Sequence, residues 1–171
     1  GMNAYEILLD AQDTPESVAQ EEKRLAAEGA EYIVLKTPVN CPQLLFGLPQ
    51  LGYNYVETVF KVEILRSDYH MPDNIARFDR GLTVAHRITP EEWQPVFDLI
   101  HSGIFRSDRV TLDPAFSPEL GGNRYANWLH SMLLKGADLY EVLKGDKGIG
   151  FFVIMRKDEK TVDPVLMAMY D

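Results

Sequence analysis

Two β-rich runs near the carboxyl end of the chain are separated by only a short charged turn, and this spacing constrains the fold strongly. The runs cover residues 149–156 and 162–170, and Lys-Asp-Glu-Lys at 157–160 lies between them. A connection this short joins antiparallel neighbours, because parallel strands need a crossover of about a dozen residues or more. The sequence therefore predicts an antiparallel hairpin, to which the run 139–144 adds a third strand.

Two amphipathic helices precede these strands and follow a further strand at 82–87. The first helix begins at Thr89-Pro90-Glu91-Glu92, which combines an N-cap, a proline at the first helical position and a capping-box glutamate. The second begins at 117–119, after a loop over 101–116. Their apolar stripes are Trp93, Val96, Phe97 and Ile100 in the first and Tyr125, Trp128, Leu129, Met132 and Leu133 in the second. We expect the order β-α-loop-α-β-β-β over residues 81–171.

The amino-terminal part of the chain predicts a separate unit of alternating strands and helices. Residues 5–9 and 32–36 are typical of strands, and helices begin at Thr14-Pro15 and at Pro42. Between Asn54 and Leu65 every second residue is apolar or threonine, which is the pattern of a long half-buried strand. We expect a β-α-β-α-β domain over residues 1–66, a polar linker over 67–80 and a second domain over 81–171, in an α/β (α+β) chain.

Composition and charge narrow the classes of partner. Of the 171 residues, 46% are apolar and 25% are charged, which is enough apolar content for a core, and the formal net charge is -9. This charge argues against nucleic acid or an anionic membrane as the main partner. No apolar run reaches the ~18 residues that span a bilayer. The single cysteine, Cys41, forms no internal disulfide, so we expect a cytoplasmic protein.

Few residues show the spacing of a chemical site. The four histidines, at 70, 86, 101 and 130, are not paired with each other or with Cys41 at ligand spacing, so we expect no metal. The glycine-rich stretch 145–150 lies between two strands, whereas a phosphate loop leads into a helix, so it predicts a hairpin turn. No catalytic base or acid is assigned.

The loop Phe105-Arg106-Ser107-Asp108-Arg109 places two arginines and an aromatic ring next to a helix end. Arginines held in a loop suit an anionic ligand, because each offers a bidentate fork of donors. The alternative is that Arg109 pairs with Asp108 or Asp113 and only braces the loop. Tyr125 and Trp128 have two interpretations as well, as ligand-stacking groups or as core.

A longer stretch around this loop resembles a known family. Arg109-Val110-Thr111-Leu112-Asp113-Pro114, followed by Tyr125 and Trp128, resembles the loop-helix signature of the TDP-fucosamine acetyltransferases, which belong to the GNAT superfamily of N-acetyltransferases. Val110 stands where that signature has an aromatic residue. The predicted order of the second domain also matches the first half of the GNAT fold. Leu48 to Tyr53, ahead of the expected long strand, resembles the amino-terminal domain of the same group.

The resemblance implies acyl transfer from acetyl-CoA to a primary amine, such as an amino sugar carried on a nucleotide. It places Phe105, Arg106, Arg109, Tyr125 and Trp128 at the acceptor, with both arginines exposed beside a cleft. The backbone of Leu166, Met167, Ala168 and Met169 would contact the pantetheine arm of acetyl-CoA.

In this family the pyrophosphate loop and a general-acid tyrosine follow the strand at 162–170, beyond Asp171. We therefore expect this chain to carry mainly the acceptor side, to bind acetyl-CoA weakly and to be inactive alone. The alternative is a non-catalytic binding or dimerisation module. If the chain ends at Asp171, we expect a homodimer whose interface contains the strand at 162–170 or the adjacent helix face.

Overall fold

The chain forms two compact units in a computed structural model that describes residues 2–106 and 108–170. The first unit extends to Phe60 and the second begins at Lys61. The first contains a two-stranded sheet and the second a four-stranded sheet, each with helices, so the expected α+β class is confirmed. None of the described helices is long and apolar enough to cross a membrane.

In the first unit, one helix connects two parallel strands that pair directly with each other. Its elements are β1 (Ala4–Leu8), α1 (Pro15–Ala27), β2 (Tyr32–Lys36), α2 (Pro42–Gly47) and the 3-10 helix η1 (Leu48–Leu51). Thr14 caps α1 as expected, since its side chain accepts from the backbone of Ser17 at 3.2 Å. The buried core consists of Val18, Cys41, Leu44 and Leu48.

The expected strand from Asn54 to Leu65 is absent, and this prediction is wrong. The residues that were to face a core are exposed instead, for example Phe60 at 79% and Val62 at 83%. A strand depends on hydrogen bonds to a neighbour, and within the described residues this segment pairs with neither sheet. Two short helices, η2 (Arg66–Asp68) and α3 (Asp73–Asp79), follow in the expected linker.

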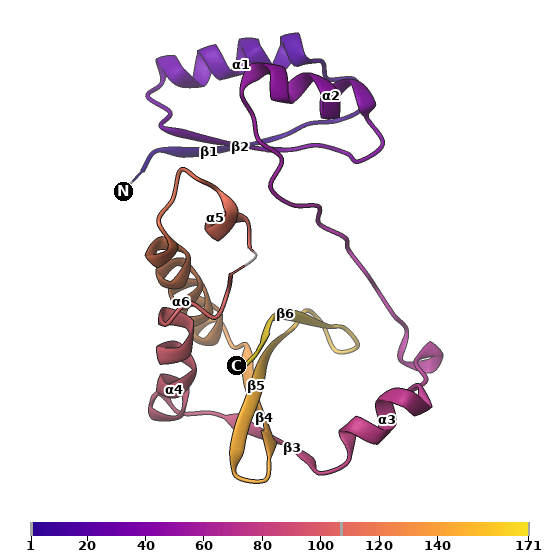
Figure 1. The fold of residues 1–171 in the computed structure, drawn as a ribbon. Coiled ribbons are helices and arrows are strands. Elements are labelled where there is room, and N and C mark those ends of the chain that lie inside the picture. The colour runs from indigo at the N-terminus through magenta and orange to yellow at the C-terminus, as the bar shows by residue number, and fades with distance from the viewer. Residues whose placement is uncertain (1, 107, 171) are drawn as a thin grey trace. The chain divides into compact units, whose positions relative to one another are not determined.

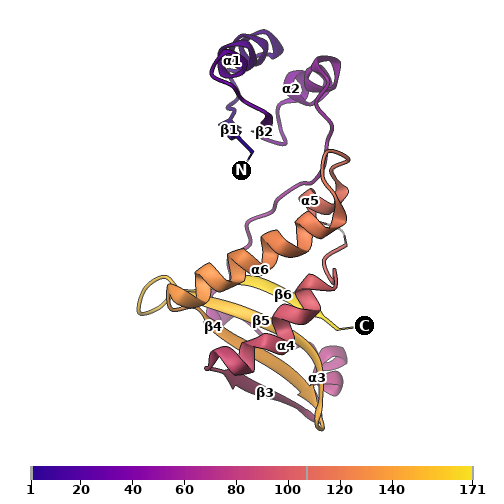
Figure 2. The ribbon, with the colours of Figure 1, turned by 90° about the vertical axis from the view of Figure 1, so that its left-hand side faces the viewer.

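From Leu82 onward, the second unit has the predicted order of elements. They are β3 (Leu82–Arg87), α4 (Pro90–His101), α5 (Arg109–Leu112), α6 (Pro118–Leu134), β4 (Asp138–Lys144), β5 (Lys147–Arg156) and β6 (Val162–Met169). The sheet order is β3-β4-β5-β6 and every pairing is antiparallel, so the predicted hairpin is confirmed. The loop expected over 101–116 contains the extra short helix α5. Figures 1 and 2 show α4 and α6 on one face of this sheet.

The main core lies between these two helices and the sheet. Side chains of Ile100 on α4 and Leu129 on α6 are fully buried there, together with Leu139 on β4 and Val153 on β5. Phe151 and Leu166 belong to the same cluster. The alternation of a strand therefore directs this set of side chains toward the helices and the intervening set to the opposite face.

The opposite face carries a cross-strand row of stacked rings. The ring centroids of His86 and Tyr140 are 4.6 Å apart, and those of Tyr140 and Phe152 are 5.1 Å apart. Met167 continues the row on β6, where it pairs with Phe152, and its side chain is 59% exposed. We call these four residues the ring ladder. His86 Nε2 also lies 3.1 Å from Asp138 Oδ1.

A matched pair of substitutions on α6 tests the helix-covered core. Leu129→Ala removes a fully buried side chain and should lower the free energy of unfolding by about 2–5 kcal/mol. Leu134→Ala makes the same chemical change at a 71% exposed position and should cost about 0.5 kcal/mol or less. Urea unfolding followed by tryptophan fluorescence reports on this unit, because both tryptophans, Trp93 and Trp128, lie in it. Equal losses would contradict the assignment of the core.

Candidate functional site

Three of the predicted acceptor residues come together in the second unit. The ring centroids of Phe105 and Tyr125 are 4.3 Å apart, and those of Tyr125 and Trp128 are 6.1 Å apart. Phe105 and Tyr125 are half-buried against the core, whereas Trp128 is 41% exposed. Trp128 therefore forms the solvent end of an aromatic cluster and does not pack within the core.

Hydrogen bonds within the loop that carries Phe105 fix its conformation, and two glycines of α6 leave room for it to pack closely. The Asp108 side chain accepts from the backbone of Val110 at 2.9 Å and from the Thr111 hydroxyl at 2.5 Å. A Cβ on Gly121 would lie 2.9 Å from Thr111 Oγ1, and one on Gly122 would lie 3.1 Å from the carbonyl oxygen of Ile100. These glycines therefore allow α6 to approach both α5 and α4 closely.

The aromatic contacts continue from this loop across the sheet. The ring of Phe105 meets Phe151 on β5 at 6.4 Å, and Phe151 meets Tyr170, directly after β6, at 6.3 Å. Trp128, Tyr125, Phe105, Phe151 and Tyr170 thus form one continuous series on the helix-covered face, which we call the aromatic run.

A charged pair lies on the same face of the sheet. Glu141 on β4 is only 14% exposed, and Arg87 on β3 is 28% exposed. Arg87 donates from Nε at 3.0 Å and from Nη2 at 2.7 Å, both to Glu141 Oε2. Two charge-assisted donors on one oxygen orient the carboxylate and compensate much of its desolvation.

Tyr170 connects the aromatic run to this pair. Its hydroxyl is buried and has no hydrogen-bond partner among the described residues. Burial raises the pKa of Tyr170, and the nearby charge of Glu141 raises it further. A Cβ on Gly148 would lie 2.2 Å from Glu141 Oε1 and 3.0 Å from the Tyr170 ring, so a side chain here would displace the Glu141 carboxylate.

The two predicted arginines are placed differently. Arg106 is exposed, and its Nε lies 3.5 Å from the carbonyl oxygen of Gly103. Arg109 begins α5 and is half-buried. A third arginine that the sequence analysis did not single out, Arg124, places its guanidinium 5.4 Å from the centroid of the Tyr125 ring. That distance is within the range of a cation–π contact.

A cavity of about 370 Å³ in this unit involves other residues. It is lined by Pro90, Trp93, Gln94, Phe97, His101, His130 and Leu134, none of which was predicted to bind the acceptor. The predicted cleft beside the two arginines therefore does not coincide with this cavity. Among the residues that the structure describes, no three His, Cys, Asp or Glu side chains gather as metal ligands do.

The residues expected at the pantetheine arm lie on β6, which is an edge strand of the described sheet. Leu166 is buried, Met167 and Met169 are 59% and 68% exposed, and Ala168 is half-buried. Val153 pairs with Leu166 but Ile154 pairs with Pro164, which leaves Val165 as the extra residue of a β-bulge. Bulges redirect backbone groups at sheet edges and next to binding sites.

Sequence reasoning missed Arg87, Glu141, Phe151 and Tyr170. All four occupy or directly follow predicted strands, so the missing information was the register. The structure pairs Arg87 with Leu139 and Ala85 with Glu141, which places Arg87 and Glu141 diagonally on one face. The signal for this pair is the presence of opposite charges inside two strands that are expected to be antiparallel neighbours.

Substituting Tyr170 tests the buried hydroxyl. Tyr170→Phe removes a polar atom that has no partner, so the free energy of unfolding at pH 7 should stay the same or rise. The pKa of Tyr170 is raised in the folded state, so its contribution to stability is present below the unfolded pKa of about 10 and is lost as the pH rises above it. Between pH 9 and 11 the free energy of unfolding should therefore fall less steeply with pH in the variant than in the wild type. An equal slope in both proteins would contradict this environment for Tyr170.

Comparison of the chain with known protein families, with curated proteins and with solved structures finds no match. Three features of the chain itself therefore bear on its function. These are the signature from Arg109 to Trp128, the order of elements in the second unit, and the geometry of the aromatic run with the Arg87–Glu141 pair.

Proposed function

We propose that the second unit is the acceptor-binding part of a GNAT-like N-acetyltransferase, which directs a small primary amine to an acetyl thioester. The observation that carries this proposal is the carboxylate of Glu141, held beside the end of an aromatic run that begins at the exposed ring of Trp128. Aromatic walls bind the body of a small ligand, and one fixed polar group sets its orientation. The order of elements agrees with the resemblance to the first half of the GNAT fold.

Glu141 is the group best placed to act as the base in this proposal. An amine attacks a carbonyl carbon only through its free lone pair, so a protonated amine must first lose a proton. Glu141 would accept that proton, while Arg87 keeps the carboxylate in a fixed orientation. Acetyl-CoA supplies the activated acetyl group, and its thiol leaves as the new amide bond forms.

The edge strand β6 fits the donor side of the same reaction. In the described sheet β6 pairs only with β5, so the backbone groups along its other edge face no strand. Leu166, Met167, Ala168 and Met169 would offer those N–H and C=O groups to the pantetheine arm. The bulge at Val165 changes their direction next to this stretch.

Charge supports an amine acceptor as well. The chain has a formal net charge of -9, which attracts a protonated amine over a long range. If the amine belongs to a sugar on a nucleotide, Arg106 and Arg109 are the groups that would contact its phosphates. Arg124 beside Tyr125 adds a further cation near the same cluster.

The test measures acetyl transfer from acetyl-CoA to a panel of primary amines, including amino sugars and nucleotide-linked amino sugars, by the release of free thiol. With the amine that reacts best, Glu141→Gln should lower kcat/KM by about 10²- to 10⁴-fold, because it removes the base but keeps the shape. Glu159→Gln, an equal charge change in the exposed β5–β6 turn, should leave the rate unchanged. Equal rates in both variants would contradict the role of Glu141. Because the chain is expected to be inactive alone, binding of the same amines is also measured by calorimetric titration, and no binding of any amine would contradict the acceptor role.

We propose a homodimerisation module as the second candidate function, because one observation favours it. The edge strand β6 exposes Val162, Met167 and Met169 beside backbone groups that no described strand pairs. Natural proteins usually cover or charge such an edge. A second copy that added its own β6 would satisfy the backbone and bury apolar area, which contributes about 25 cal/mol per Å².

Light scattering with two lysine substitutions tests this second function. The wild-type chain should give a dimer mass at micromolar concentration, and Met169→Lys should shift it toward the monomer. Val84→Lys is the matched control, since Val84 is 57% exposed on β3 at the opposite edge of the same sheet. A monomer mass for the wild type, or the same shift in the control, would refute the use of β6.

A further inference from the structure

Residues 54–65 carry a row of apolar side chains that is largely exposed to solvent. We call this segment the strap. Every second residue belongs to the row, and Phe60, Val62 and Ile64 are 79%, 83% and 65% exposed. The strap pairs with neither described sheet. A segment with this alternation becomes stable on a strand edge, because pairing satisfies its backbone and burial removes its apolar area from water.

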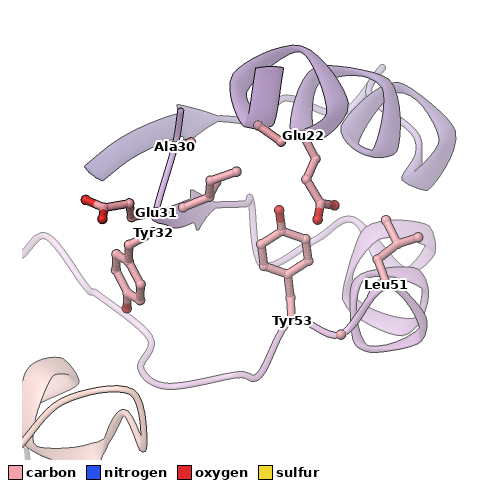
Figure 3. A pocket seen from close by; sticks show the side chains of 9 residues that line it. Glu22, Ala30, Glu31, Tyr32, Leu51 and Tyr53 are labelled. Atoms are coloured by element: carbon pink, nitrogen blue, oxygen red, sulfur yellow. The ribbon is translucent and has the colours of Figure 1, made fainter. Parts of the chain in front are cut away.

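The chain is anchored in the first unit immediately before the strap. Tyr53 donates from its backbone to the carbonyl of Leu48 at 3.2 Å, and its ring packs against the small core of that unit. Figure 3 shows its hydroxyl pointing toward Glu22. Gly52, with φ of +93°, makes the turn that leads into these contacts, a conformation that glycine adopts without strain. The strap therefore begins directly after an anchored residue.

The second unit has an open strand edge that suits an extended segment. β6 bonds to β5 along one side, and its outer N–H and C=O groups face no strand in the described sheet. Leu166 and Ala168 pack against the core under α4 and α6, whereas Met167 is 59% exposed. An edge of this kind accepts an extended segment as an additional strand.

Charges place the end of the strap beside the start of β6, and all four of the groups involved belong to the second unit. The pKa of Lys61 is raised by its hydrogen bond to Glu63 and, to a smaller extent, by the carboxylate of Asp163. The pKa of Glu63 is lowered by Lys61 and, less strongly, by Lys157, which itself lies 2.6 Å from Asp163. Lys61 thus responds to Asp163 and Glu63 also to Lys157, which precedes Asp163 in the chain. This order indicates a strap that runs antiparallel to β6.

Side-chain alternation then selects the register. The apolar row extends the core only if its members lie opposite residues that face α4 and α6, since a shift by one residue turns the row to the other side of the sheet. Phe60 opposite Leu166 meets this condition. Val59 then lies opposite Met167, on the exposed face. Lys61 falls close to the start of β6, in agreement with its charge contact.

The chain can return from such a strap to the far edge of the sheet. Four strand spacings of about 4.8 Å separate this position from β3, and residues 66–81 connect the two. Figures 1 and 2 show α3, within this connection, on the side of the sheet away from α4 and α6. The connection therefore follows the uncovered face and does not block the edge of β6.

We propose that the strap closes onto β6 of its own chain as a fifth, antiparallel strand, and that this structure has the strap open. Because the strap is attached to the same chain, it meets its own β6 at a higher effective concentration than a second copy offers. The closed strap would occupy the edge that the proposed function assigns to the pantetheine arm or to a second copy. Its competition with either partner rests on that function, whereas closure itself does not.

Disulfide trapping in the full chain tests closure and register. Val59→Cys with Met167→Cys should form an internal disulfide under mild oxidation, because opposite Cα atoms of antiparallel strands lie about 4.5–5.5 Å apart, within the reach of a disulfide. Thr58→Cys with Met167→Cys is the matched control, since neighbouring side chains of a strand point to opposite faces, and it should react at least about tenfold more slowly. The native Cys41 is buried and is present in both variants.

Hydrogen exchange followed by NMR measures closure without added cysteines. The closed strap should protect those amides of β6 that do not bond to β5. Val62→Lys should raise their exchange rate by about threefold or more, because the charge has to leave water when the strap closes. Val39→Lys, the same change at a 65% exposed position before the strap, should leave these rates unchanged.

Three results would overturn the proposal. Equal disulfide rates in the two cysteine pairs would mean that the strap meets β6 without the register of a strand. A disulfide that joins two chains, seen as a dimer on a non-reducing gel, would assign the edge to a second copy. Equal exchange rates in the wild type and in Val62→Lys would mean that the strap does not cover β6. Since none of these measurements uses an acetyl donor or an amine, a failure of acetyl transfer remains distinguishable from a failure of closure.

Discussion

The packing of α4 and α6 on one face of the four-stranded sheet is the interaction on which the second unit depends. It buries Ile100, Leu129, Leu139 and Val153 completely. Because side chains alternate along a strand, Glu141, two residues after Leu139, lies on the same face of the sheet. A carboxylate is therefore brought into partly apolar surroundings by the same geometry that forms the core. Arg87, placed diagonally on the neighbouring strand, is the partner that makes this placement tolerable.

The same packing explains why the aromatic residues form one series. Gly121 and Gly122 allow α6 to lie close to α5 and α4, which brings the loop of Phe105 onto Tyr125. Phe151 belongs to the core cluster and lies under that loop. The series therefore continues from a helix to the far strand without a gap, and an exposed ring at one end is connected to a buried phenol at the other.

Elements with strong local signals were predicted from the sequence. The cap of α1, the helix start at Thr89 and the charged turn between β5 and β6 each determine local structure through neighbouring residues alone. The stretch from Asn54 to Leu65 also has a strong local pattern, but a strand needs a partner, and the pattern of one segment cannot supply it. Tyr125 and Trp128 were singled out from the signature, and Phe105 from the loop that carries the two arginines. Glu141 and Tyr170 were missed because their meeting depends on strand register.

The ring ladder limits what the uncovered face of the sheet can recognise. Its rings stack on one another across the strands, with interplanar angles of 20° between His86 and Tyr140 and 15° between Tyr140 and Phe152. Both faces of the central Tyr140 ring are therefore occupied by neighbouring rings. The edge of an aromatic ring carries partial positive charge, whereas its face carries partial negative charge. A flat ligand that binds by stacking therefore finds no free face at Tyr140, where carbonyl or carboxylate oxygens can approach only the ring hydrogens.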